Sequence, residues 1–262
     1  MVDLLSVAGL LGLAVGSFLN VVAHRVPRGE SVVHPPSACP GCGARIRNRH
    51  NVPVAGWLVL RGRCADCDTR ISPRYPLVEL GTGLLFAVVA WRMVCLDLWA
   101  AVPAYLYFTA AGVALLLIDL DTRRLPNTIV LPSYPVLTVL LTTSAAVSDD
   151  WGALTRAGIG AVALFTFYFL VVLAYPAGMG WGDVKLSGLV GAVLGYLSWS
   201  TLVVGAFAGF VLGAVTGVAV MAARRGDRKT ALPFGPFMIT GALLAIFVGQ
   251  SVADLYLNTL TG

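Results

Sequence analysis

Two kinds of residue in this sequence are spaced for chemistry, and the first is cysteine. Four cysteines form two CxxC pairs, Cys39-Pro-Gly-Cys42 and Cys64-Ala-Asp-Cys67. Each pair brings two thiolates onto one tight turn, and two such turns supply the four ligands of a closed tetrahedral zinc site. We therefore predict a structural zinc ion held by all four cysteines. Two disulfides are the alternative, and these persist only in an oxidising compartment.

The second kind is aspartate beside long apolar stretches. Asp119 ends one such stretch and Asp183 begins another. Acidic residues at a membrane are unfavourable, so their presence there marks candidates for function. Two carboxylates brought together share a proton, as in aspartic proteases, where one activates water and the other hydrogen-bonds the scissile carbonyl. Asp119 and Asp183 are accordingly the predicted catalytic pair.

A structural role for these aspartates remains open. Asp183 has Lys185 two residues away, and Asp121 is followed by Arg123, so ion pairs would account for the charges. Asp119 and Asp121 are two residues apart, and on a continued helix they face nearly opposite directions. Only one of the two is therefore expected to face Asp183.

The elements that must position these residues are apolar. Hydrophobic residues make up 58% of the 262 residues and charged residues only 12%, with a mean hydropathy of +0.83. A soluble domain has about a quarter charged residues, so this composition excludes one. We predict an all-α polytopic membrane protein with about eight transmembrane helices. The expected spans are 4–23, 77–94, 99–118, 129–146, 157–175, 184–196, 201–223 and 237–253.

The distribution of lysine and arginine predicts the orientation. Residues 24–76, 119–128, 176–185 and 224–230 hold 16 of the 18 basic residues, and alternating spans put all four segments on one side. By the positive-inside rule that side is the cytoplasm. Both aspartates then lie at the cytoplasmic edge of their spans, although 64 residues separate them. Disulfides in the cysteine segment would not persist on that side.

The same reading divides the chain into three parts. Residues 1–23 form the first span, 24–76 a cytoplasmic tetracysteine zinc module, and 77–262 a membrane domain of about seven helices. Glycines repeat every four residues in several spans, as in Gly12/Gly16 and Gly205/Gly209, which predicts close helix packing. The nine arginines of the module follow from topology, and few aromatic residues accompany them, so we expect no nucleic-acid partner.

Further motifs follow one another along the chain: Gly16-Ser-Phe-Leu-Asn20 continuing to Pro27, the paired CxxC motifs, Arg74-Tyr-Pro-Leu-Val-Glu79, Asp119 with Leu125-Pro126, Gly178 to Lys185, and Pro233-Phe-Gly-Pro236. By these motifs and their order the chain resembles the bacterial type IV prepilin peptidases, which combine leader peptidase and N-methyltransferase activity and are membrane aspartic peptidases. The family often has Asp where this chain has Asn127, which leaves the aspartate pair intact.

This resemblance implies an activity and its partners. Asp119 and Asp183 would cleave the basic leader from prepilins or pseudopilins, after a glycine, at the cytoplasmic face of the bacterial inner membrane. The new N-terminal residue, usually phenylalanine, would then be methylated with S-adenosylmethionine. No nucleotide-binding fingerprint is visible, so the residues that bind S-adenosylmethionine are unknown.

Two other functions remain open on the residues alone. A proton-coupled transporter would use the same aspartates as a relay, although its acidic residues are expected at mid-membrane. A zinc scaffold without chemistry would need neither aspartate.

Overall fold

The computed structural model describes residues 2–176, 179–223 and 233–261, and every regular element in these ranges is helical. Gly178 of the glycine motif and the basic segment 224–230 lie outside them. The elements are α1 (Val2–Arg25), η1 (Val26–Arg28), η2 (Asn48–His50), α2 (Ala55–Val59), α3 (Arg74–Cys95), η3 (Trp99–Ala101), α4 (Val102–Thr122), α5 (Asn127–Ser148), α6 (Trp151–Ala174), α7 (Trp181–Leu197), α8 (Trp199–Ala222) and α9 (Gly235–Thr261).

Seven helices are long and apolar enough to cross a membrane, namely α1, α3, α4, α5, α6, α8 and α9. The chain is therefore an all-helical, multi-pass membrane protein, as its composition predicts. The remaining predicted span, 184–196, corresponds to α7, which has only 17 residues. At 1.5 Å per residue α7 is about 26 Å long, which is short for a hydrocarbon core of about 30 Å.

The chain forms two compact units, Met1–Val102 and Pro103–Gly262. The first holds α1, the cysteine segment and α3, and the second holds nearly all of α4 and the helices that follow it. The segment 77–262, predicted as one domain, therefore has residues in both units. The predicted division at residues 23 and 76 remains a prediction.

In the first unit, glycines bring α1 and α3 to backbone contact. A Cβ at Gly12 would lie 2.8 Å from the Cα of Gly83, and one at Gly16 would lie 2.8 Å from the Cα of Glu79. Small residues at such contacts provide the van der Waals packing that associates helices in lipid. The predicted packing role of Gly12 and Gly16 is confirmed.

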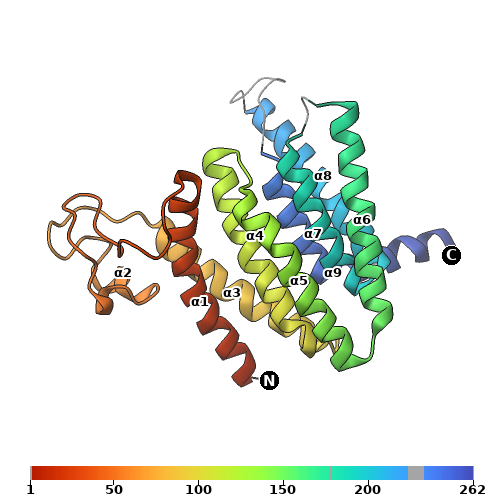
Figure 1. Ribbon diagram of the computed structural model, residues 1–262, viewed down its shortest axis with the longest axis horizontal. Coiled ribbons are helices and arrows are strands. Elements are labelled where there is room, and N and C mark those ends of the chain that lie inside the picture. The colour runs from red at the N-terminus through yellow and green to blue at the C-terminus, as the bar shows by residue number, and fades with distance from the viewer. Residues whose placement is uncertain (1, 177–178, 224–232, 262) are drawn as a thin grey trace. The chain divides into compact units, whose positions relative to one another are not determined.

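In the second unit, α7 is the buried helix, and α6 and α7 lie side by side (Figure 1). Twelve of its 17 residues are buried, which explains how a helix too short to span alone is accommodated. A Cβ at Gly160 of α6 would lie 2.5 Å from the carbonyl oxygen of Gly191, and one at Gly195 would lie 2.7 Å from that of Arg156. Glycine at these positions therefore permits the close approach of α6 and α7.

The predicted glycine ridge on α8 packs against α9. A Cβ at Gly209 would lie 3.3 Å from the Cα of Met238, and one at Gly205 would lie 3.0 Å from the Cβ of Ala245. The packing role predicted for these glycines is confirmed.

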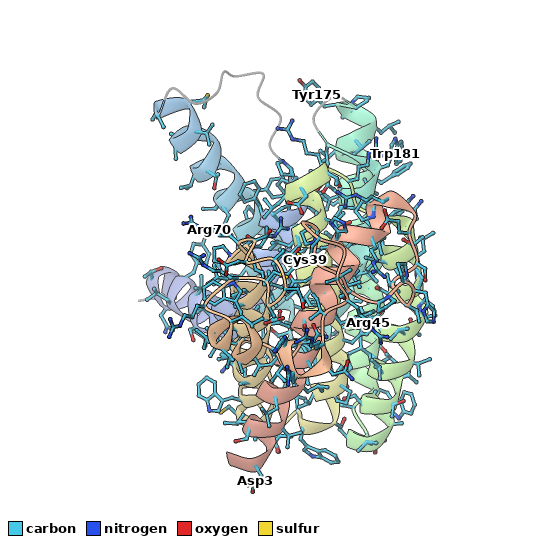
Figure 2. All side chains as sticks on the ribbon, turned by 90° about the vertical axis from the view of Figure 1, so that its left-hand side faces the viewer. Asp3, Cys39, Arg45, Arg70, Tyr175 and Trp181 are labelled. Carbon is cyan, nitrogen blue, oxygen red and sulfur yellow. The ribbon has the colours of Figure 1, made fainter. Side chains whose placement is uncertain are left out.

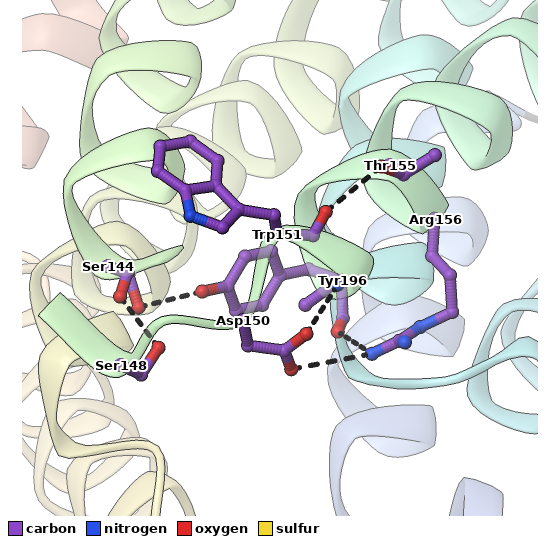
Figure 3. Close-up of polar contacts among 8 residues, drawn as sticks. Ser144, Ser148, Asp150, Trp151, Thr155, Arg156 and Tyr196 are labelled. Carbon is purple, nitrogen blue, oxygen red and sulfur yellow. Dashed lines mark hydrogen bonds and ion pairs between the residues drawn. The ribbon is translucent and has the colours of Figure 1, made fainter. Parts of the chain in front are cut away.

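A polar network joins α5, α6 and α7 where α5 meets α6 (Figure 3). Asp150 caps α6 by accepting a hydrogen bond of 2.8 Å from the amide of Ala153. The guanidinium of Arg156 donates to the carbonyl of Tyr196 at 3.3 Å, and the hydroxyl of Tyr196 donates to Ser144 at 2.9 Å. These bonds fix the end of the second unit that is remote from Asp119 and Asp183.

Candidate functional site

Asp119 lies in the last turn of α4, and its side chain is turned into the second unit. The residue is only 4% exposed, whereas Asp121, two residues later, is exposed. The backbone amide of Gly235, the first residue of α9, donates a hydrogen bond to the Asp119 carboxylate. The expectation that only one of the two neighbouring aspartates points inward therefore agrees with the burial.

Asp183 lies in the first turn of α7 and is 7% exposed. Its carboxylate accepts a hydrogen bond of 3.1 Å from the amide of Gly180, and its own amide donates to the carbonyl of Gly180. This reciprocal pair is a capping arrangement that fixes the start of α7. Tyr175 and Trp181 mark this end of the second unit in Figure 2.

The two carboxylates lie close enough to interact electrostatically. Leu125, in the connection between α4 and α5, packs against the two glycines that adjoin them, Gly182 and Gly235. A Cβ at Gly182 would lie 2.8 Å from the Cβ of Leu125, and one at Gly235 would lie 3.3 Å from its methyl groups. The turn after α4, the start of α7 and the start of α9 therefore converge on one site.

Aromatic side chains border this pair. Tyr168 of α6 interacts electrostatically with Asp183, and its ring stacks on Phe210 of α8 with centroids 5.5 Å apart. Phe234, which precedes Gly235, contacts both rings at centroid distances of 5.9 and 5.2 Å. Tyr168 and the two rings packed on it therefore form an apolar cluster next to Asp183, and electrostatic interactions are stronger in apolar surroundings than in water.

Lys185 makes a different contact from the ion pair with Asp183 that the sequence left as an alternative. Its ammonium donates to the Oδ1 atom of Asn127 at 3.0 Å, and its carbonyl accepts a hydrogen bond of 2.6 Å from the hydroxyl of Tyr134. Both partners lie on α5. The charge of Lys185 is thus held by a neutral amide at the edge of the site.

Two buried carboxylates that interact electrostatically repel each other when both are ionised, so such a pair favours a state with one shared proton. One member is then a base and the other an acid. This arrangement can activate water and polarise a carbonyl group at the same time.

Among the residues that the structure describes, the four cysteines form a cluster of potential metal ligands. Their sulfur atoms all lie within 4.8 Å of one another, and those of Cys39 and Cys67 are 3.7 Å apart. A tetrahedral site with metal–sulfur bonds of about 2.3 Å has sulfur–sulfur edges of about 3.8 Å. The spacing therefore fits a single metal ion bound by four thiolates.

The two CxxC turns share one backbone design. The amide of Gly43 donates to the carbonyl of Cys39 at 2.9 Å, and that of Asp68 donates to the carbonyl of Cys64 at 3.1 Å. Gly43 and Asp68 both have left-handed backbones, with φ of 72° and 59°. Cys39, Arg45 and Arg70 mark this module in Figure 2.

Thr69 prepares one thiol of the cluster for metal binding. Its hydroxyl and its backbone amide hydrogen-bond the sulfur of Cys67 and lower the pKa of that thiol, whereas the pKa of the neighbouring thiol of Cys42 is raised. Because the thiolate is the ligand form of cysteine, the contact with Thr69 favours the ligand form of Cys67.

Gly62 occupies a backbone conformation that glycine adopts freely, with φ of +70°. A Cβ there would also lie 2.8 Å from the Trp57 ring, whose Nε1 donates to the carbonyl of Ile71 at 3.1 Å. Gly62 is thus packed between the second CxxC turn and the aromatic ring beneath it.

Glu79 of α3 anchors the cysteine segment to that helix, a role that its place in a sequence motif does not reveal. Its buried carboxylate accepts a hydrogen bond of 2.7 Å from the amide of Val54. Val54 has φ of +61°, which is rare for a β-branched residue. Glutamate buried in an apolar span is the sequence signal that would have identified this contact.

Comparisons with known proteins match nearly the whole chain to one group of membrane peptidases. Residues 10–93 match the bacterial peptidase A24 N-terminal domain, and residues 105–218 match the type IV leader peptidase family. A prepilin leader peptidase/N-methyltransferase of Pseudomonas putida is 38% identical, with 95% of this chain and 92% of that protein covered. Proteins of the same name from Pseudomonas aeruginosa (35%, 95% and 92%) and Neisseria gonorrhoeae (36%, 94% and 91%) are also similar.

No solved structure matches the chain. The relatives nevertheless exceed 30% identity over more than nine-tenths of both sequences. The chain belongs to the type IV leader peptidase family.

Proposed function

We propose that this chain is an aspartic endopeptidase that removes the leader from prepilin-like proteins, with Asp119 and Asp183 as its catalytic pair. The observation that carries the proposal is that these two carboxylates, from helices distant in sequence, are both buried and interact electrostatically at one end of the second unit. The names of the relatives supply the reaction, leader cleavage and N-methylation.

The pair performs the hydrolysis with one shared proton. The ionised carboxylate takes a proton from water while the protonated partner hydrogen-bonds the scissile carbonyl oxygen. The resulting hydroxide adds to the carbonyl carbon and forms a tetrahedral diol. The pair then delivers a proton to the amide nitrogen, the C–N bond breaks, and a carboxyl group and a free amine result.

The charge pattern of the sequence supports a cytoplasmic position for this reaction. The segments beside the aspartates belong to the lysine- and arginine-rich side of the chain, which the positive-inside rule assigns to the cytoplasm. A substrate with a basic leader before an apolar helix has the same orientation. Its scissile bond would then lie at the level of the pair.

We further propose that the chain methylates the new N-terminal amine with S-adenosylmethionine and that its four cysteines hold zinc. The cysteine site fits zinc because four thiolates at tetrahedral spacing are the usual ligands of a structural zinc ion. Zinc would stabilise the folded cysteine module, in which much of the chain is irregular.

Incubation of the purified protein with a prepilin tests the peptidase directly. We expect loss of the leader with the wild type, and no cleavage with Asp119→Asn or Asp183→Asn, because an amide can serve neither as the base nor as the carboxylic acid of the pair. Asp121→Asn is the matched control, since this neighbour on α4 is exposed, and it should cleave nearly normally.

Cleavage at near wild-type rate by either of the first two variants would remove the pair from the mechanism. A wild-type protein that leaves the prepilin intact would favour a transporter or a zinc scaffold, because neither cleaves a peptide bond.

A further inference from the structure

Tyr134 of α5 contacts the turn of α7 that carries Asp183. Its hydroxyl donates a hydrogen bond of 2.6 Å to the carbonyl oxygen of Lys185, two residues beyond Asp183. Gly188 provides the space for this hydroxyl, because a Cβ at that position would collide with it. The contact therefore requires both the hydroxyl of Tyr134 and the absence of a side chain at Gly188.

A second bond from α5 reaches the same residue of α7. The ammonium of Lys185 donates to Asn127 at 3.0 Å, so the backbone and the side chain of Lys185 are both tied to α5. Burial of much of the Tyr134 ring raises the strength of its hydrogen bond relative to one in water. α5 is thus a fixed support for the first turn of α7.

The start of α7 needs such a support because its own backbone is permissive. Gly182 directly precedes Asp183 and Gly180 lies three residues before it, and glycine restricts backbone angles less than any other residue. The cap from Gly180 fixes the carboxylate within its own turn, and contacts from neighbouring helices fix where that turn lies relative to Asp119. Among these, the bond from Tyr134 is a directional one to the backbone of the same helical turn.

We propose that Tyr134 is a positioning residue that holds Asp183 at its working separation from Asp119. The inference rests on the proposed peptidase function. Among the described residues, the titratable groups that interact with Asp183 are Asp119 from α4 and Tyr168 from α6, while Lys185 follows it on α7. Tyr134 acts on the site through the α7 backbone, without reaching the substrate.

The separation of the two carboxylates has a measurable consequence. Strong coupling increases the difference between the pH values at which a carboxylate pair loses its two protons, and the pair is active in the pH interval between these values. If the first turn of α7 loosens, the carboxylates move apart and their coupling weakens. The active pH interval then narrows, whereas a simple loss of folded enzyme lowers activity equally at every pH.

The test compares Tyr134→Phe with Tyr105→Phe in the prepilin cleavage assay. Tyr105 makes the same kind of bond, from its hydroxyl to the carbonyl of Val193 on α7, at 2.7 Å. Val193 is ten residues beyond Asp183, which is about 15 Å along the helix. The control therefore removes a hydroxyl from the same helix, more deeply buried but remote from the site.

For Tyr134→Phe we expect kcat to fall about tenfold, KM to stay within about twofold, and the active pH interval to narrow by about half a unit. Tyr105→Phe should keep the wild-type interval. Gly188→Ala, which displaces the hydroxyl from its space, should narrow the interval as Tyr134→Phe does.

An interval of wild-type width in both Tyr134→Phe and Gly188→Ala would overturn the inference, as would equal narrowing in Tyr105→Phe. These results would leave the peptidase proposal intact, provided that Asp183→Asn is inactive. Cleavage by Asp183→Asn would instead refute the proposed function itself.

Discussion

Alanine at Gly235 would act on the proposed catalytic pair through a single carbon atom. The added Cβ would lie 2.6 Å from the Oδ2 atom of Asp119. Because ordinary contacts begin near 3.4 Å, the carboxylate must retreat by about 0.8 Å. The methyl groups of Leu125, at 3.3 Å from the same position, limit movement of the new side chain away from it.

A displacement of about 1 Å at a catalytic group lowers the rate by about 100-fold, which corresponds to about 2.7 kcal/mol in the activation free energy. Folding should be preserved, because alanine is at least as compatible with a helix as glycine. Gly235→Ala is therefore expected to accumulate normally in the membrane while its kcat for leader cleavage falls about 100-fold.

Steady-state cleavage of a purified prepilin, resolved by the size of the product, measures this effect. Gly158→Ala is the matched control, since a Cβ on this α6 glycine would meet no atom within 4 Å. The control should cleave at the wild-type rate. A folded Gly235→Ala protein with kcat within about threefold of wild type would show that the position of Asp119 does not govern the reaction.

Three further changes test the other parts of the molecule. Replacement of Cys39 and Cys42 by serine should release about one zinc ion per chain, measured by elemental analysis, because two thiolates cannot close the site. A wild-type protein that is purified without chelator and contains no transition metal would contradict the zinc site. Valine at Gly62 would be strained by the left-handed backbone and would collide with the Trp57 ring, so this change should lower methylation more than cleavage. Mass spectrometry of the processed pilin measures both activities in one sample. Equal loss of both would mean that the cysteine module also docks substrate for cleavage. Leucine at Gly191 would collide with the backbone of α6 and should destabilise the folded protein by about 1–3 kcal/mol or more, seen as a lower thermal unfolding temperature. An unchanged unfolding temperature would contradict the close contact of α6 and α7.

The helices were predictable because each is a long apolar run, and the composition and charge pattern alone exclude a soluble domain. The exception was α7, for which the sequence left open whether the short apolar run crosses the bilayer fully. A hydropathy pattern registers that residues 184–196 are apolar but does not distinguish burial in protein from burial in lipid. The structure makes that distinction, since α7 is surrounded by other helices and does not have to span the bilayer alone.

The candidate site was predictable to the level of its charged residues. Asp119 and Asp183 are conspicuous because carboxylates are rare beside apolar spans, and topology places both at one edge. Gly235 and Tyr134 were not predictable as parts of this site, because a glycine amide and a tyrosine hydroxyl give no signal in sequence. Their roles depend on which helices are neighbours, and one sequence does not determine those contacts.

The enclosure of α7 by other helices has a consequence for how the protein responds to its lipid. Because twelve of its 17 residues are buried, α7 presents little surface to acyl chains. Neighbouring helices, and not a thinned bilayer, therefore accommodate a helix about 4 Å shorter than the hydrocarbon core. Leader cleavage is accordingly expected to differ little between vesicles of short-chain and of long-chain lipids with the same headgroups.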